Sequence, residues 1–252
     1  MKKRLLLNIV LIPFIGFAQL QTIFQSKIDS IYEKKKDAVG IIVHVEAPKQ
    51  NISWSYAKGV SDIKTNEILN SKQPVLIASN TKPYVAAAIL RLVEKGQVRI
   101  NQSIKNLLSK MTRQLIEKDG YDLNTITVKH LLSHTSGIQD YVDDAYFELV
   151  IQRPQYKWTK EEQIKRVMEI GSPQKIGEKF SYGDINYLLL AEIIEQKKRQ
   201  PFYTIIRDLL KYKELSLTQK WFIDLEKYPS KALPLAHQYA DKYNWDSGIR
   251  MI

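Results

Sequence analysis

Sequence that favours β-strands is concentrated in one early stretch, and this uneven order constrains the fold more than any other feature. Residues 39–45 and 52–57 are rich in β-forming side chains, and a turn at 48–51 separates them, which predicts a hairpin. From residue 79 onward, helical periodicity dominates. Two strands do not form a stable sheet by themselves. We therefore expect either that the hairpin packs on helices, or that strands completing its sheet are absent from the chain.

Apolar spacing and capping signals predict the helices. Thr127 and the Thr159–Glu162 capping box mark two helix starts, and Gly96 marks an end. Residues 58–74 are predicted to be a polar loop, and the segment after 211 is predicted to be irregular. The predicted helices cover residues 20–37, 79–96, 103–118, 128–133, 159–170, 186–196 and 202–211.

Residues 1–18 have the pattern of a secretory signal peptide. Basic residues at 2–4 precede an apolar run at 5–17, with Gly16 and Ala18 at the spacing of a cleavage site. The run is shorter than a normal membrane span, and an uncleaved anchor is the alternative. We expect an exported protein, periplasmic or secreted, whose residues 19–252 form one domain.

Composition narrows the chemistry and the partners. The chain has no cysteine, which excludes disulfides, thiol nucleophiles and thiolate metal sites. The formal net charge is +11, and removal of residues 1–18 would leave +8. This surplus favours peripheral contact with an anionic envelope surface. Nucleic acid is not expected as a partner, because the lysines are scattered among acids and no nucleic-acid motif is present. The sequence carries no signal for an oligomeric state.

Ser79 and Lys82 form a candidate catalytic pair. Their three-residue spacing places them on one face of a helix, where a desolvated lysine could take the serine proton. A helix N-terminus would add positive potential beside the serine. The same S-x-x-K pattern starts at Ser55, Ser61 and Ser172, in turn or loop sequence. The match at Ser79 is the one that opens an amphipathic helix.

A second dense stretch, at residues 177–190, places Tyr182 in a glycine-bounded loop just before a helix. Asp184 has the position of an N-cap. For either residue alone, the default interpretation is structural: a packing aromatic and a helix cap.

Three motifs together resemble the serine β-lactamase and penicillin-binding-protein superfamily. They are SNTK at 79–82, HLLSHTSGI at 130–138 and GEKFSYGDINYLLL at 177–190. The similarity is to the branch of class C β-lactamases, D-alanyl-D-alanine carboxypeptidases and esterases. It implies an α/β (α+β) fold of the β-lactamase/transpeptidase type, with an antiparallel sheet flanked by helices and a helical subdomain.

The resemblance also implies site roles. Ser79 would be the acylated nucleophile, Lys82 would accept or relay its proton, and Tyr182 would pass a proton to the leaving group. The Ser79 backbone N–H would form half of an oxyanion hole, and His134 with Ser136 would form a structural turn. The implied substrate is a cell-wall peptide, a small ester or a β-lactam, with no cofactor.

Two departures from the family pattern are visible. Asp184, at a substrate-binding position, stands where the family has asparagine; an ionised aspartate donates no hydrogen bond and favours a protonated Lys82. The family's third motif, Lys- or His-x-Gly on a later strand, does not follow Tyr182. These features predict a chain that lacks the C-terminal strands of the fold. The alternative hypothesis is accordingly a catalytically silent family member or a peptidoglycan-binding remnant.

Other constellations are weaker. His130 and His134 have a helical metal-ligand spacing, but Leu131 stands where a zinc protease has glutamate, so no metal is expected. A triad of Ser136, His134 and Asp140 is also disfavoured, because no nucleophile-elbow motif surrounds the serine. We expect His44 and His237 to be structural.

Overall fold

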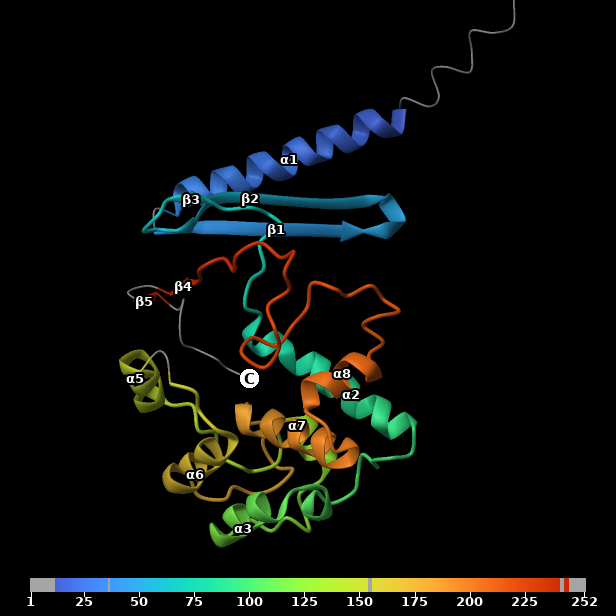
Figure 1. Ribbon diagram of the computed structural model, residues 1–252, viewed down its shortest axis with the longest axis vertical. Helices are drawn as coiled ribbons and strands as arrows, with labels where there is room; N and C mark the ends of the chain where they lie inside the picture. Colours follow the sequence, from blue (N-terminus) through green and yellow to red (C-terminus); the bar gives the residue numbers. More distant parts are fainter. Residues whose placement is uncertain (1–11, 36, 154–155, 241–242, 245–252) are drawn as a thin grey trace, which may run out of the picture. The chain divides into compact units, whose positions relative to one another are not determined.

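The computed structural model describes residues 12–35, 37–153, 156–240 and 243–244 (Figure 1). Within these residues the chain divides into two compact units. Unit 1 comprises the described residues up to Leu76 together with those from Ser230 to Asn244, and unit 2 runs from Ile77 to Pro229.

Unit 1 contains the predicted hairpin. Strands β1 (Gly40–Ala47) and β2 (Ile52–Asp62) pair antiparallel, from Gly40 opposite Gly59 to Ala47 opposite Ile52. A 3₁₀ turn, Pro48–Gln50, joins them, followed by Asn51 in the left-handed region (φ 53°). The hairpin prediction is confirmed.

The prediction of a loop over residues 58–74 is partly wrong. Strand β2 continues to Asp62, and the short strand β3 (Glu67–Ile68) turns back to pair with it. The reason is that the backbone pairing persists as far as the residue just before β1, with Val60 N–H donating to Val39 O at 3.0 Å. The order of this three-stranded sheet is β1-β2-β3.

Helix α1 (Ile12–Lys34) lies across one face of the hairpin (Figure 1). Phe24 packs against Trp54, with ring centroids 5.5 Å apart, and Tyr56 donates a hydrogen bond to Asp29 at 2.7 Å. The hairpin therefore packs on a helix, the first of the two expected arrangements.

The helix begins at Ile12, before its predicted start at residue 20, and most of the predicted signal segment (1–11) lies outside the described residues. Among the described helices, none has the length and apolar character needed to span a membrane.

The segment after residue 211 is not irregular throughout, because two short strands, β4 (Tyr239–Ala240) and β5 (Tyr243–Asn244), pair antiparallel in unit 1. The backbone of this segment is tied to the residues before unit 2, with Ala236 N–H donating to Pro74 O at 2.9 Å.

Unit 2 is built around helix α7 (Asp184–Lys198), which is apolar on most of its circumference and almost entirely buried. A helix of this kind belongs in the centre of a core. Among the helices that pack against it are α2 (Lys82–Glu94), α4 (Val128–Leu132), α6 (Lys160–Ile170) and α8 (Phe202–Leu209). Helix α3 (Lys110–Lys118) packs on α6.

The capping signals located helix starts well. Both predicted capping motifs are present, at Thr127 before α4 and at Thr159 before α6. The predicted helix over 103–118 is wrong at its start: residues 105–107 form a 3₁₀ turn, and α3 begins after Ser109, whose hydroxyl caps Thr112 N–H at 3.2 Å. Helix α5 (Asp144–Gln152), capped by Asp143, was not predicted.

One fully buried carboxylate links three helices of unit 2. Glu192 on α7 accepts two hydrogen bonds, both at 2.8 Å. One comes from the N–H of Ser109, the N-cap of α3, and the other from the hydroxyl of Thr112 within α3. Lys160 at the start of α6 supplies the counter-charge, with its Nζ 3.4 Å from the same carboxylate. A buried charge is tolerated when it is paired and hydrogen-bonded in this way.

Candidate active site

Ser79 lies in a 3₁₀ turn, Ala78–Thr81, immediately before α2. The sequence predicted that the α-helix itself starts at Ser79, whereas α2 starts at Lys82. Residues three apart eclipse one another in a 3₁₀ turn, so the pair still shares one side. Ala78 has a left-handed backbone (φ 43°), which is uncommon for a residue with a side chain. Ser79 is exposed at this turn, whereas Lys82 is buried.

Lys82 and Tyr182 converge on the Ser79 hydroxyl. The Lys82 Nζ lies 3.1 Å from Ser79 Oγ, and the Tyr182 hydroxyl lies 2.9 Å from the same atom. The Lys82 Nζ is also 4.7 Å from the centroid of the Tyr182 ring. Three residues that the sequence analysis selected from two distant motifs therefore meet at one oxygen atom, all within unit 2.

Asp184 is not the N-cap of α7 that its position suggested. The N-cap is Gly183, and the buried Asp184 side chain forms an ion pair with Lys82. The capping function falls to Asp140, whose Oδ1 accepts from Ile185 N–H at 3.3 Å. Asp140 lies more than forty residues earlier in the chain, so no local pattern around α7 signals it.

The ion pair determines the resting charge of the site. Burial by itself lowers the pKa of the Lys82 ammonium, but the hydrogen bond and the charge of Asp184, with a smaller contribution from Tyr182, outweigh burial and raise the pKa above its ordinary value. Lys82 is therefore protonated at neutral pH. Burial also raises the pKa of the Asp140 carboxyl, and the negative charge of Asp184 adds to this, against hydrogen bonds from backbone N–H groups at the start of α7.

The loop that carries Tyr182 is aligned on the turn at residues 134–137. Three backbone hydrogen bonds join them: Gln174 N–H to Gly137 O at 2.9 Å, Gly177 N–H to Thr135 O at 2.8 Å and Ser181 N–H to His134 O at 2.8 Å. Gly137 has φ 76°, and a Cβ there would lie 2.3 Å from the carbonyl oxygen of Gln174, so only glycine fits. The expected structural turn is present, and it supports the Tyr182 loop directly.

Neither weaker constellation assembles. The Ser136 hydroxyl donates to Asn186 at 2.6 Å and has no contact with the His134 ring, whose Nδ1 accepts from Gly183 N–H at 3.2 Å. His130 uses its Nδ1 in the capping box of α4. Across the described part of the chain, no group of three or more histidine, aspartate or glutamate residues has metal-site geometry. His44 contacts Ser55 and Glu46, and His237 lies 3.9 Å from Asp62.

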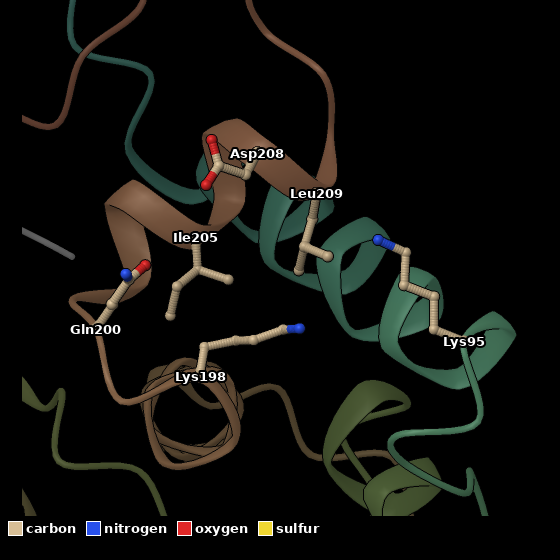
Figure 2. A pocket seen from close by; sticks show the side chains of 6 residues that line it. All are labelled: Lys95, Lys198, Gln200, Ile205, Asp208 and Leu209. Carbon is tan, nitrogen blue, oxygen red and sulfur yellow. The ribbon is translucent and has the colours of Figure 1, made fainter.

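A small pocket lies elsewhere in unit 2, where the C-terminal ends of α2 and α7 approach α8 (Figure 2). It is lined by Lys95, Lys198, Gln200, Ile205, Asp208 and Leu209. None of these residues contacts Ser79. Lysines are common at helix C-termini, where they compensate the helix dipole, so their presence has a structural explanation.

Comparison with known proteins identifies the family. The family model described as Beta-lactamase matches residues 28–213, which include Ser79, Lys82, Tyr182 and Asp184. The chain belongs to the β-lactamase family. It is 31% identical to Protein flp of Staphylococcus aureus over 132 residues, and 26% identical to the putative penicillin-binding protein PbpX of Bacillus subtilis over 217 residues. It is also 29% identical to esterase EstB of Burkholderia gladioli over 116 residues.

The match to Protein flp covers 52% of this chain and 25% of the relative. The match to PbpX covers 84% of this chain and 49% of the relative, and the match to EstB covers 45% and 29%. The chain thus spans about half the length, or less, of the curated relatives it matches. Among solved structures, D-amino acid amidase from Ochrobactrum anthropi aligns with a TM-score of 0.73 at 20% identity, covering 92% of this chain and 63% of the amidase. The penicillin-binding protein homologue from Pyrococcus abyssi aligns with a TM-score of 0.66 at 26% identity, covering 85% and 48%. The expected α+β fold of the β-lactamase/transpeptidase type is confirmed.

Proposed function

We propose that this protein is a serine hydrolase that forms an acyl-enzyme on Ser79. One observation carries the proposal: Lys82 Nζ and the Tyr182 hydroxyl both lie within hydrogen-bond distance of Ser79 Oγ, at 3.1 and 2.9 Å. A serine becomes a nucleophile when neighbouring groups can take its proton. Membership of the β-lactamase family supports the same reaction class.

In the proposed reaction, Ser79 Oγ bonds to the acyl carbon of the substrate and the bond to the leaving group breaks. The serine proton passes through Lys82 and Tyr182 to the leaving oxygen or nitrogen. Water then attacks the acyl-enzyme, releases the acid and returns the proton to Ser79. The resting ion pair with Asp184 opposes the first transfer, because Lys82 must lose its proton before it can accept another.

The charge of the site supports a choice among the three expected substrate classes. Asp184 neutralises Lys82, the cation that contacts Ser79, so this cluster offers no net positive charge to a carboxylate. β-Lactams and D-alanyl peptides carry a carboxylate, whereas a small ester does not. We therefore propose an uncharged ester or amide as the preferred substrate.

This function is tested by comparing a neutral p-nitrophenyl ester with a chromogenic cephalosporin, using the full chain, Ser79→Ala and Asp184→Asn. We expect ester hydrolysis that Ser79→Ala abolishes, and a shift of preference towards the cephalosporin in Asp184→Asn. Equal ester hydrolysis by wild type and Ser79→Ala would contradict the proposal. Faster cephalosporin than ester turnover by the wild type would contradict the choice of substrate.

A second candidate is a catalytically silent family member that binds peptidoglycan. The Lys82–Asp184 ion pair favours it, because a lysine held in its charged form is a poor base. Sedimentation with purified peptidoglycan, together with absent ester hydrolysis, would support this candidate.

We also propose that the protein is exported. The basic, apolar and small-residue pattern of residues 1–18 supports this. N-terminal sequencing of the expressed protein tests it: a mature chain beginning at residue 19 is expected, and an intact Met1 in the cytoplasmic fraction would contradict it.

A further inference from the structure

We propose that His134 is a positioning residue that holds the Tyr182 hydroxyl against Ser79. The inference deepens the proposed function and rests on Tyr182 acting at Ser79. The His134 ring stacks on the Tyr182 ring, and its hydrogen bonds reach the residues on either side of Tyr182, so we expect its effect on Ser79 to act through Tyr182.

His134 binds the backbone on both sides of Tyr182. Its carbonyl oxygen accepts from Ser181 N–H at 2.8 Å, and its ring Nδ1 accepts from Gly183 N–H at 3.2 Å. The ring also stacks on the Tyr182 ring, with centroids 4.6 Å apart and an angle of 30° between the planes. Tyr182 is 49% exposed, so surrounding packing constrains it only in part. His134 therefore restrains the main chain and the ring of Tyr182 together.

His134 is itself firmly placed. It is 8% exposed and adopts the left-handed backbone region, with φ 54°. The centroid of the Tyr187 ring, on α7, lies 5.1 Å from the centroid of the His134 ring. The Phe180 ring packs edge-on against the His134 ring, with a centroid distance of 5.8 Å. The Asn186 amide also lies 3.3 Å from Nδ1. Because several contacts fix the His134 side chain, it can hold Tyr182 in one position.

The contacts require a neutral ring. A backbone N–H only donates, so Nδ1 must be the unprotonated nitrogen and Nε2 must carry the hydrogen. Burial lowers the pKa of His134, and the positive charge of Lys82 lowers it further, against the charge of Asp184. The titratable groups facing the ring are thus Lys82 from α2, Asp184 and Tyr187 from α7, and Tyr182 from the loop. Protonation of Nδ1 would place its N–H against the Gly183 N–H and break this hydrogen bond.

Two substitutions separate the two kinds of contact. His134→Asn places an acceptor oxygen close to the position of Nδ1, tolerates a left-handed backbone and removes the ring. His134→Phe keeps the ring and removes the acceptor. His130→Gln is the matched control, because His130 also accepts a backbone N–H, from Thr127 at 3.2 Å, and glutamine suits that capping position.

The first readout is the rate at which a fluorophosphonate modifies Ser79. A misplacement of about 1 Å in a catalytic group costs on the order of 10²-fold in rate. We expect a fall of that order for His134→Phe, a smaller fall for His134→Asn, unchanged reagent affinity in both, and a wild-type rate for His130→Gln. Circular dichroism and melting verify that each variant is folded.

The second readout does not depend on activity. In ¹⁵N–¹H NMR spectra, the Gly183 amide should move as the pH is lowered below the ordinary histidine value, in the wild type and in His130→Gln but not in His134→Asn. A wild-type labelling rate in folded His134→Phe would overturn the proposal. So would a wild-type Gly183 amide whose chemical shift does not change with pH. An unlabelled wild type whose Gly183 amide titrates would contradict the proposed function, while the positioning by His134 would stand.

Discussion

Lys82 and Asp184 form a buried ion pair beside the hydroxyl of Ser79, although 102 residues separate them in the sequence. The pair joins the start of α2 to the start of α7, so it is a structural link as well as a charge relationship. Because Asp184 holds the ammonium form of Lys82, this contact sets the pH at which lysine can act as a base.

Replacing Asp184 should therefore move the pH profile. Asp184 raises the pKa of Lys82, and asparagine keeps the shape without the charge, so Asp184→Asn should lower that pKa. Below the pKa, each unit of lowering gives about tenfold more neutral lysine at a given pH. We expect the rate of Ser79 modification to rise at lower pH in Asp184→Asn than in the wild type. Rates of fluorophosphonate labelling between pH 6 and 11 measure this.

Asp140→Asn is the matched control for that experiment. It removes a neighbouring, half-buried carboxylate that caps α7 but does not pair with Lys82. Its pH profile should stay close to that of the wild type. Identical profiles for Asp184→Asn and Asp140→Asn would show that the ion pair does not control Lys82.

The Tyr182 hydroxyl should matter more than its ring. Tyr182→Phe keeps the stack on His134 and removes the oxygen that lies 2.9 Å from Ser79 Oγ. Proton transfer by a positioned side chain contributes about 10²–10⁴-fold in rate. We expect a loss in that range for ester hydrolysis, with an unchanged melting temperature. Tyr187→Phe, which loses only a 3.3 Å hydrogen bond to Leu132 O, should retain activity, and a similar loss in both variants would refute the role of Tyr182.

Glu192 should dominate the stability of unit 2 among its polar residues. Glu192→Ala leaves the Ser109 N–H and the Thr112 hydroxyl without their shared acceptor, whereas Lys160 keeps its ion pair with Glu195. Leaving a buried hydrogen-bond donor unsatisfied costs about 1–3 kcal/mol. Urea denaturation at pH 7 should show a loss of this size for Glu192→Ala and a smaller one for Glu192→Gln. A loss below about 1 kcal/mol for Glu192→Ala would contradict the importance of the network.

Acid should weaken the fold through His134. Its pKa is lowered in the folded protein, so the unfolded chain binds the proton more readily. Stability from the neutral ring is complete above the unfolded pKa of about 6.5 and is lost as the pH falls towards the folded pKa. Denaturation midpoints at pH 7.5 and 5.0 should therefore differ more for the wild type than for His134→Asn. Equal differences would contradict the contribution of His134.

The sequence predicted local features better than long-range ones. The hairpin, the helix cap at Thr127 and the capping box at Thr159 follow from side chains within a few residues of one another, and all three were found. The motifs also selected Ser79, Lys82 and Tyr182 before their positions were known. Family resemblance supplied the fold class, which periodicity alone did not determine.

Tertiary partners were not predictable in the same way. Asp184 looks like a helix cap because its local position is that of one, but the buried Lys82 attracts its carboxylate and Asp140 takes over the cap. The bonds from His134 to both sides of Tyr182 have no signature within either segment. The left-handed backbone at Ala78 was likewise unexpected for that residue type.

Covalent labelling tests whether Ser79 is a nucleophile. The full chain and Ser79→Ala are incubated with a fluorophosphonate and, separately, with a penicillin, and adducts are mapped by peptide mass spectrometry. We expect a fluorophosphonate adduct on the Ser79 peptide, absent from Ser79→Ala, with slower modification by the carboxylate-bearing penicillin. A folded chain that forms no adduct on Ser79 with either reagent would contradict the assignment of Ser79 as a nucleophile.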